Sequence, residues 1–163
     1  SRLPVVGAVQ GLCLAGGLEL MMSCDVVFAE QSARIGCQHA RYGLVPGWGG
    51  TQRLPRLVGL RRALDLMYSG RWLTAIEAQD FGLVNHLTAD GASAQAAGDY
   101  CADLARKSAG GLATMKRLAR SGIDMPLAEG IALEQGAVVD ALLARDVSEG
   151  LAAFQARREP VFQ

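Results

Sequence analysis

The sequence predicts an α/β fold in which an α/β core is followed by a purely helical region. Two short apolar runs rich in β-branched residues, 5–9 and 26–29, have the composition of buried strands. The segment between them contains an apolar helical stretch, which predicts a βαβ crossover with the two strands parallel. The rest of the chain is largely helical in pattern. We therefore divide the chain into a core at 1–91 and a helical region at 92–163.

The elements of the core can be assigned in order along the chain. A strand ends at Gln10-Gly11, and the Gly-rich segment from Leu12 leads into an apolar helix that reaches Cys24. A polar turn after the second strand precedes a short strand at Arg34–Gly36. Residues 42–51 are then dense in Gly and Pro, which is typical of a functional loop because glycine lets backbone and ligand approach closely.

Helix signals dominate the remainder of the chain. Leu60, Leu64 and Met67 share one face of a helix that stops at Gly70. Residues 74–77 form a capping box, and Gly82 is a C-terminal stop after Phe81. Four more amphipathic helices are expected, at 92–108, 112–121, 126–145 and 148–158.

Composition excludes several classes of function. Lys and Arg together number 16, as do Asp and Glu, so the chain has no net charge to attract nucleic acid or an anionic membrane. The apolar stretches are too short to span a bilayer, and no secretion signal is visible. The four cysteines form no C-x-x-C pair and only two histidines are present, so we expect no metal site. A cytoplasmic setting with free thiols is expected.

Residues 11–20 form the most informative motif, in which a strand leads into Gly16 and Gly17 at the start of a helix. Unpaired backbone N–H groups and the positive end of a helix dipole point outward together at such a junction. That geometry stabilises an anion such as a phosphate, a carboxylate or a developing enolate oxygen. Close packing of a strand against a helix uses the same glycines, so the pattern alone leaves both interpretations open.

Several segments, in order and at matching spacing, resemble the signature of the crotonase superfamily, which includes the enoyl-CoA hydratase/isomerase family. These segments are Pro4–Gly11, Ala15–Leu20, Cys24-Asp25 and Pro46–Leu54, followed by Gly70, residues 75–84 and residues 149–162. The resemblance covers essentially all of the chain. The chain is therefore identified as a member of this superfamily.

The resemblance implies a spiral of ββα turns, followed by C-terminal helices that build homotrimers or hexamers. It also implies an acyl-CoA thioester as ligand and no cofactor, since coenzyme A is part of the substrate. The thioester oxygen would lie between two backbone N–H groups, one of them matching Gly16, with Leu14 and Gly17 beside it in the motif. Because the sequence opens within strand-like residues, we expect that an N-terminal portion with the second N–H group is absent from it.

The acid–base groups of the family are matched only in part. Hydration of an enoyl thioester activates a water at one carbon and delivers a proton to its neighbour, which suits two groups in opposite protonation states. The resemblance implies a pair of Glu residues, of which Glu19 matches the first and His39 stands at the second position. Glu19 could also be a surface carboxylate at a helix start, although its neighbours are apolar. His39 is either a proton carrier or a structural histidine.

Other residues have weaker assignments. Gly47 and Trp48 match the loop that walls the acyl pocket in relatives, where Trp48 would replace a small residue and either narrow the pocket or serve only in packing. Arg157 and Arg158 match a region that contributes to CoA binding, although cations are also favoured at a helix C-terminus. His86 is expected on the surface.

These features predict an acyl-CoA-transforming enzyme that stabilises a thioester enolate, most simply an enoyl-CoA hydratase or isomerase. Glu19 is the expected general acid/base. Decarboxylation and thioester hydrolysis remain open as reactions. The alternative is a catalytically impaired acyl-CoA-binding homologue, which His39 in place of a carboxylate would permit. A structural subunit completed by another chain is a third possibility.

Overall fold

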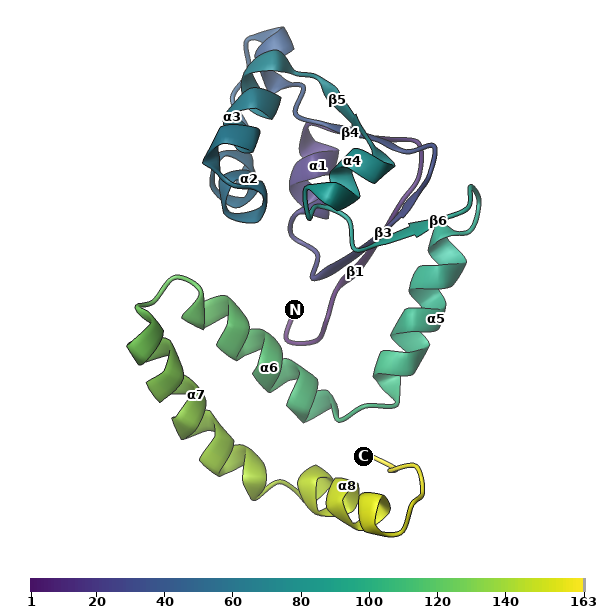
Figure 1. Ribbon diagram of the computed structural model, residues 1–163, viewed down its shortest axis with the longest axis vertical. Helices are drawn as coiled ribbons and strands as arrows, with labels where there is room; N and C mark the ends of the chain where they lie inside the picture. The colour runs from purple at the N-terminus through teal and green to yellow at the C-terminus, as the bar shows by residue number, and fades with distance from the viewer. Residues whose placement is uncertain (163) are drawn as a thin grey trace. The chain divides into compact units, whose positions relative to one another are not determined.

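The computed structural model describes residues 1–162 and forms two compact units (Figure 1). The first unit runs from Val5 to Tyr100 and contains the strands. The second comprises Ser1–Pro4 and the described residues from Cys101 onward, and it is helical. The expected boundary between residues 91 and 92 stays a prediction.

In the first unit the strands and helices alternate along the chain. The strands are β1 (Val6–Val9), β2 (Leu12–Leu14), β3 (Val26–Glu30), β4 (Arg34–Gly36), β5 (Trp72–Thr74) and β6 (His86–Thr88). The helices are α1 (Gly16–Met21), the 3-10 turn η1 (His39–Tyr42), α2 (Gly50–Val58), α3 (Leu60–Ser69) and α4 (Ala75–Asp80). Helix α5 (Ser93–Ala105) begins in the first unit and continues into the second.

The strands form two small sheets, and the first four strands belong to them in turn. One sheet has the order β1-β3-β6 and is parallel throughout. The other has the order β2-β4-β5, in which β2 and β4 are parallel and β5 is antiparallel to β4. Strands β1 and β2, one in each sheet, precede α1, and strands β3 and β4, again one in each sheet, precede η1. The expected α/β core with a ββα spiral is confirmed.

The register between β2 and β4 positions the candidate site. Leu14 at the end of β2 pairs with Gly36 at the end of β4, and the next residue, Ala15, donates its N–H to the Gly36 carbonyl at 3.0 Å. Both strands are parallel, so their carboxyl ends lie at the same edge. The start of α1 and the segment after β4 are therefore neighbours, although they are far apart in sequence.

The core of the first unit fills the space between these elements with aliphatic side chains. Its largest fully buried hydrophobic residues come from the helices α1, α2 and α3 and from the strands β4 and β5, namely Leu18, Ile35, Leu54, Leu66 and Leu73. Burial of each such side chain contributes about 1.5–3 kcal/mol. Helix α1 is thereby fixed against the sheets, which holds its first turn in place.

Several expected elements differ from the observed ones. The stretch from Leu12 was assigned to a Gly-rich lead into a helix, whereas Leu12–Leu14 forms β2 and α1 is confined to Gly16–Met21. The strands β5 and β6 were not predicted. Three residues are too few to show an alternating pattern, and β4, which is as short, was expected only because a polar turn precedes it. The expected helix at 126–145 ends at Leu142, because Ala144 is extended and starts a new helix.

The second unit contains three helices after the end of α5: α6 (Ala109–Gly122), α7 (Leu127–Leu142) and α8 (Arg145–Gln155). Helices α6 and α7 lie side by side as a hairpin (Figure 1). Gly122 and Gly130 face each other across the hairpin, where a Cβ added at Gly130 would lie at an ordinary contact distance of 3.7 Å from the carbonyl oxygen of Gly122. Many large apolar side chains of this hairpin and of the residues after it are exposed, including Leu127, Ile131, Val139, Leu142 and Leu143.

The expected capping box at the start of α4 is present. Thr74 Oγ1 accepts from the Glu77 N–H at 3.2 Å, and Glu77 Oε2 accepts from the Thr74 N–H at 2.8 Å and its hydroxyl at 2.9 Å. The Thr74 backbone bond, followed by its hydroxyl bond, lowers the pKa of Glu77. The box satisfies N–H groups that the first helical turn leaves free. The stop at Gly82, which has φ 79°, is also observed.

Removing this cap should lower the stability of the first unit. We expect Thr74→Ala to reduce the free energy of unfolding by about 1 kcal/mol at neutral pH, measured by urea denaturation. Thr74→Ser keeps the hydroxyl and is the control. Because the pKa of Glu77 is lowered in the folded state, its carboxylate stabilises the fold at pH values above the ordinary pKa of 4.5. This stabilisation is lost as the pH falls through the lowered pKa. The loss caused by Thr74→Ala should therefore shrink in acid, and an equal loss at all pH values would contradict the role of Glu77.

Candidate active site

The Glu19 side chain is buried in the first turn of α1 and is tied to the loop that precedes α2. Its Oε1 atom accepts hydrogen bonds from the backbone N–H of Trp48 and of Gly50, each at 2.8 Å. The residue is 3 % exposed, which excludes a surface carboxylate. A Cβ added at Gly50 would lie 2.7 Å from Pro46 Cβ and 3.0 Å from Oε1, so the loop has no room for a side chain there. Oε1 is thus occupied by two fixed donors.

The second carboxylate oxygen of Glu19 faces His39. His39 Nε2 lies 3.4 Å from Glu19 Oε2, and the imidazole is 11 % exposed. His39 opens η1 directly after the segment that follows β4, so the parallel register described above brings it to α1. The structure thereby brings together the two residues that the sequence selected. Since Oε1 already accepts two bonds, a proton shared by this pair resides on Oε2 or on Nε2.

Ala15 holds the backbone of the Gly-rich motif in an unusual conformation. Its φ of 49° and ψ of −114° lie in a region that residues with a Cβ rarely adopt. The conformation is held by the Ala15 N–H bond to Gly36 and by the Ala15 carbonyl, which accepts from the Glu19 N–H at 3.1 Å. It sets the direction of the following N–H, that of Gly16. Strain stored beside a candidate oxyanion site is consistent with a functional constraint.

Gly16 and Gly17 have different surroundings. A Cβ at Gly16 would lie 3.1 Å from the indole ring of Trp48, so the ring lies directly against this backbone. A Cβ at Gly17 would meet only Cys13 Sγ, at an ordinary 3.8 Å. A side chain at Gly16 would therefore push the indole outward by a few tenths of an ångström, whereas a Cβ at Gly17 would displace nothing. Leu14, at the end of β2, leads into the strained turn.

Trp48 has three contacts at the site. Its N–H binds Glu19, its carbonyl accepts from Arg53 Nη1 at 2.5 Å, and its ring covers Gly16. The residue is nevertheless 71 % exposed, so the far face of the indole is open. Gly47 has open space where a Cβ would be. The Trp48 ring of this loop thus lies against the backbone at Gly16, and the expected role of the loop as a pocket wall stays a prediction.

Sequence reasoning did not select Cys37, which contacts His39 from the opposite side. Its Sγ atom lies 3.5 Å from His39 Nδ1, and the residue is 2 % exposed. Burial raises the pKa of the Cys37 thiol, and the nearby Glu19 adds to this, whereas the backbone N–H of His39 opposes it. The sequence could have indicated this contact, because Cys37 lies two residues before His39 and directly after a strand.

Other sequence candidates lie apart from these contacts or have other partners. Arg158 forms a two-pronged bond to Glu149 at 2.6 and 2.9 Å, which lowers the Glu149 pKa to about 2. Arg157 follows the end of α8 with a φ of 51°. His86 is exposed on β6, as expected, and stacks on Phe28 with ring centroids 4.5 Å apart.

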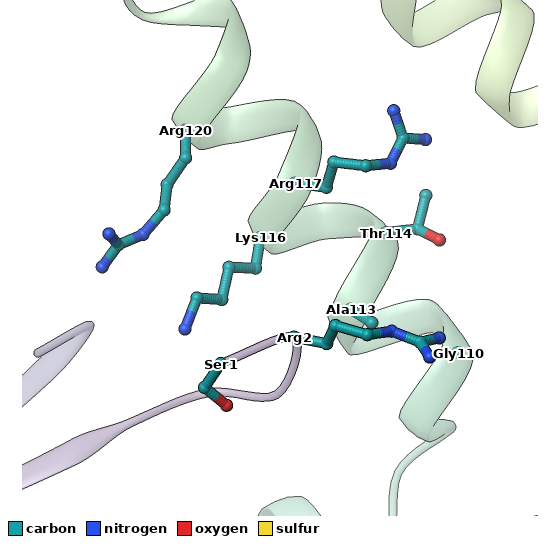
Figure 2. Close-up of a pocket in the computed structure, with 8 residues that line it drawn as sticks. All are labelled: Ser1, Arg2, Gly110, Ala113, Thr114, Lys116, Arg117 and Arg120. Carbon is teal, nitrogen blue, oxygen red and sulfur yellow. The ribbon is translucent and has the colours of Figure 1, made fainter.

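The second unit has a cationic hollow of about 510 Å³ (Figure 2). Arg2 from the N-terminal stretch and Lys116, Arg117 and Arg120 from α6 line it. Lys116 Nζ donates to the Leu3 carbonyl at 2.9 Å. Exposed cations are mobile and screened by salt, so the lining by itself does not define a ligand site.

Within residues 1–162, no group of three or more His, Cys, Asp and Glu side chains is arranged to hold a metal ion. None of the helices in that range is long and apolar enough to cross a membrane.

Comparisons with known proteins agree on one family. The model of the family described as enoyl-CoA hydratase/isomerase matches residues 1–163. A putative enoyl-CoA hydratase/isomerase of Bacillus subtilis is 38 % identical over 160 residues, which cover 98 % of this chain and 62 % of that protein. The human mitochondrial methylglutaconyl-CoA hydratase is 35 % identical over 164 residues, covering 98 % of this chain and 48 % of that protein. The chain thus spans about half to three fifths of these relatives.

Solved structures agree with the fold. The enoyl-CoA hydratase of Bacillus anthracis has 35 % sequence identity and a TM-score of 0.95, over 99 % of this chain and 62 % of that one. A putative enoyl-CoA hydratase/isomerase of Mycobacterium abscessus has 31 % identity and a TM-score of 0.97, with the same coverage of both chains.

Because Ala15 is strained, we expect that its replacement by glycine stabilises the fold. Replacing a residue in a strained positive-φ conformation by Gly relieves about 1–3 kcal/mol, part of which is offset by the greater freedom of Gly in the unfolded chain. We expect Ala15→Gly to raise the free energy of unfolding by about 1 kcal/mol, measured by urea denaturation. Ala78→Gly, within α4, is the control and should lower it by about 1 kcal/mol. Destabilisation by both variants would show that Ala15 is not strained.

Proposed function

The chain belongs to the enoyl-CoA hydratase/isomerase family of the crotonase superfamily, and we propose that the protein transforms acyl-CoA thioesters by stabilising an enolate-like anion. The contact between the buried Glu19 Oε2 and His39 Nε2, on the helix that Gly16 begins, is the observation on which this proposal rests. Family membership supports a lyase or isomerase. The relatives' printed names favour hydration or isomerisation of an enoyl-CoA as the reaction.

The backbone at Gly16 would stabilise the substrate oxygen. An N–H fixed in direction by the strained Ala15 needs little reorganisation when negative charge develops on a thioester oxygen. Such a donor stabilises the transition state by about 3 kcal/mol when it is preorganised. Coenzyme A would enter as part of the substrate, without a separate cofactor.

Glu19 would move the proton, and His39 would support its carboxylate. In hydration, Glu19 Oε2 accepts a proton from the attacking water and delivers it to the neighbouring carbon, so the water supplies both groups that add to the double bond. His39 Nε2, 3.4 Å away, would donate a hydrogen bond to the carboxylate and keep its proton, because a neutral imidazole that lost it would become an anion. In isomerisation, Oε2 removes a proton from one carbon and returns it to another. Both reactions therefore require an ionised Glu19.

Trp48 would set the shape of the acyl pocket. Its indole lies against Gly16 and exposes its other face, so an acyl group bound at the oxyanion position would contact the ring. Together with Leu14, Gly17 and Gly47, this ring would limit the width of the pocket near the thioester. We propose Trp48 as the residue that selects acyl shape.

The alternative function is a catalytically impaired acyl-CoA-binding homologue, in which His39 has replaced a catalytic carboxylate and turnover is lost. Its distinguishing property would be binding of CoA esters without turnover. Calorimetric titration of the whole protein with an enoyl-CoA, beside hydratase, isomerase and thioesterase assays, separates the two. Turnover supports the enzyme, and tight binding with no turnover in any assay supports the binding protein.

We expect Glu19→Gln to abolish most of the activity without breaking the site. The amide oxygen of Gln can replace Oε1 as acceptor for Trp48 and Gly50, whereas the amide nitrogen cannot take a proton as Oε2 does. The turnover number for crotonyl-CoA should fall by about 10²-fold or more, with affinity changed only a few-fold. Glu30→Gln, at a buried carboxylate bonded to Ser93, is the matched control and should stay near the parent. Unchanged turnover in Glu19→Gln would remove Glu19 from the mechanism.

The second unit would mediate assembly in a cytoplasmic setting. Exposed leucines at the end of α7 form an apolar surface that a second copy could bury, which supports a homotrimer or a hexamer built from two trimers.

Light scattering on the whole protein should therefore give the mass of a trimer or hexamer at micromolar concentration. The pair Leu142→Glu and Leu143→Glu should reduce it toward the monomer, because buried unpaired charge is costly. Gln135→Glu adds charge at an exposed polar position of α7 and should leave the mass unchanged. A monomeric parent would refute the proposed assembly.

A further inference from the structure

Both ring nitrogens of His39 are occupied, on opposite sides of the imidazole. Nε2 faces Glu19 Oε2 at 3.4 Å, and Nδ1 faces Cys37 Sγ at 3.5 Å. The three side chains therefore form a line from thiol to imidazole to carboxylate. Cys37 and Glu19 are almost completely buried, so water does not compete for these contacts. The position of the ring proton of His39 therefore depends on which group donates at each of these two contacts.

The thiol is a donor and not a nucleophile. Burial raises the Cys37 pKa, so sulfur keeps its proton at neutral pH. A reactive cysteine needs a lowered pKa and access to substrate, and Cys37 has neither. The backbone N–H of His39 also points at this sulfur, which uses its weak acceptor capacity. The S–H group is left to donate to Nδ1.

The alternative tautomer of His39 fits the same contacts poorly. With its proton on Nδ1, the ring would direct an N–H at a sulfur that already accepts one bond. Nε2 would then present a lone pair to Glu19 Oε2, which repels it unless the carboxyl group itself is protonated. With the proton on Nε2, the thiol donates to Nδ1 and Nε2 donates to Oε2. Each donor then has an acceptor.

We propose that Cys37 is a positioning residue whose thiol donates to Nδ1 of His39 and holds the imidazole with its proton on Nε2, directed at Glu19. The tautomer follows from the contacts alone, whereas its consequence for catalysis rests on the proposed function. Cys37 would keep the ring proton on the side of the imidazole that faces the carboxylate. The imidazole then replaces a protonated carboxyl group as the neutral hydrogen-bond donor of the pair, and the Glu19 carboxylate is the group that transfers the proton.

The first test reads the protons directly in the whole protein. In ¹⁵N NMR of histidine-labelled protein, the resonances that His39→Gln removes should show Nδ1 unprotonated and Nε2 protonated. The infrared S–H band that Cys37→Ala removes should lie at low frequency and move up in His39→Ala. Cys13→Ala, at a buried thiol beside Met21, is the control and should leave the His39 resonances in place. A proton on Nδ1, or a Cys37 band insensitive to His39, overturns the proposal.

The second test reads the consequence for turnover. Loss of one positioning hydrogen bond should lower kcat about 5-fold in Cys37→Ala while KM is unchanged. Cys37→Ser retains a donor and should recover at least half of the lost rate, whereas Cys37→Val should not. Equal rates in the Ala and Ser variants, or a kcat like the parent in Cys37→Ala, would overturn the positioning role. An inactive parent that shows the expected tautomer would instead refute the proposed enzyme function.

Discussion

Both oxygens of the Glu19 carboxylate have partners, and the layout of the site depends on how these partners are divided between them. Oε1 joins α1 to the loop before α2 through two backbone N–H groups, which places Trp48 over Gly16. Oε2 is left for His39. Because one oxygen is structural and the other is available for proton transfer, a single side chain both builds the pocket wall and takes part in the chemistry proposed for it.

Sheet register explains why these groups meet. Leu14 and Gly36 are paired at the same edge of two parallel strands, so a turn after each strand starts from adjacent positions. One turn contains the strained Ala15 and leads to Glu19, and the other leads through Cys37 to His39. A shift of one strand by one residue would move each of its side chains to the opposite face of the sheet. The buried side chain of Ile35 in β4, which fits only one face, therefore holds the site in alignment.

Much of this arrangement could be predicted from the sequence, and the remainder depends on contacts between distant segments. The long apolar strands, the capping box at Thr74 and the pairing of Glu19 with His39 follow from composition, local spacing and family resemblance. The three-residue strands β2, β5 and β6 could not be predicted, because their stability comes from pairing and not from their own pattern, whereas β4 was expected from the polar turn before it.

The contacts that refine the site were also invisible in the sequence. The N–H groups that bind Glu19 belong to residues 48 and 50, and a backbone donor has no signature in a side-chain pattern. Cys37 was not selected from the sequence, because its approach to His39 depends on the bend after β4. The residue types of the site could be selected from the sequence, whereas their contact partners depend on the tertiary structure.

The position of Trp48 has an optical consequence. The emission of an indole depends on the polarity around it, and this ring has one face on the backbone of Gly16 and the other in water. An acyl chain entering beside it would exchange water for hydrocarbon at the exposed face. Trp72, whose ring lies near Gly36, is further along the same sheet edge and contributes a background signal. The protein therefore contains its own fluorescent reporter at the point where a thioester would bind, and occupancy can be followed without a label.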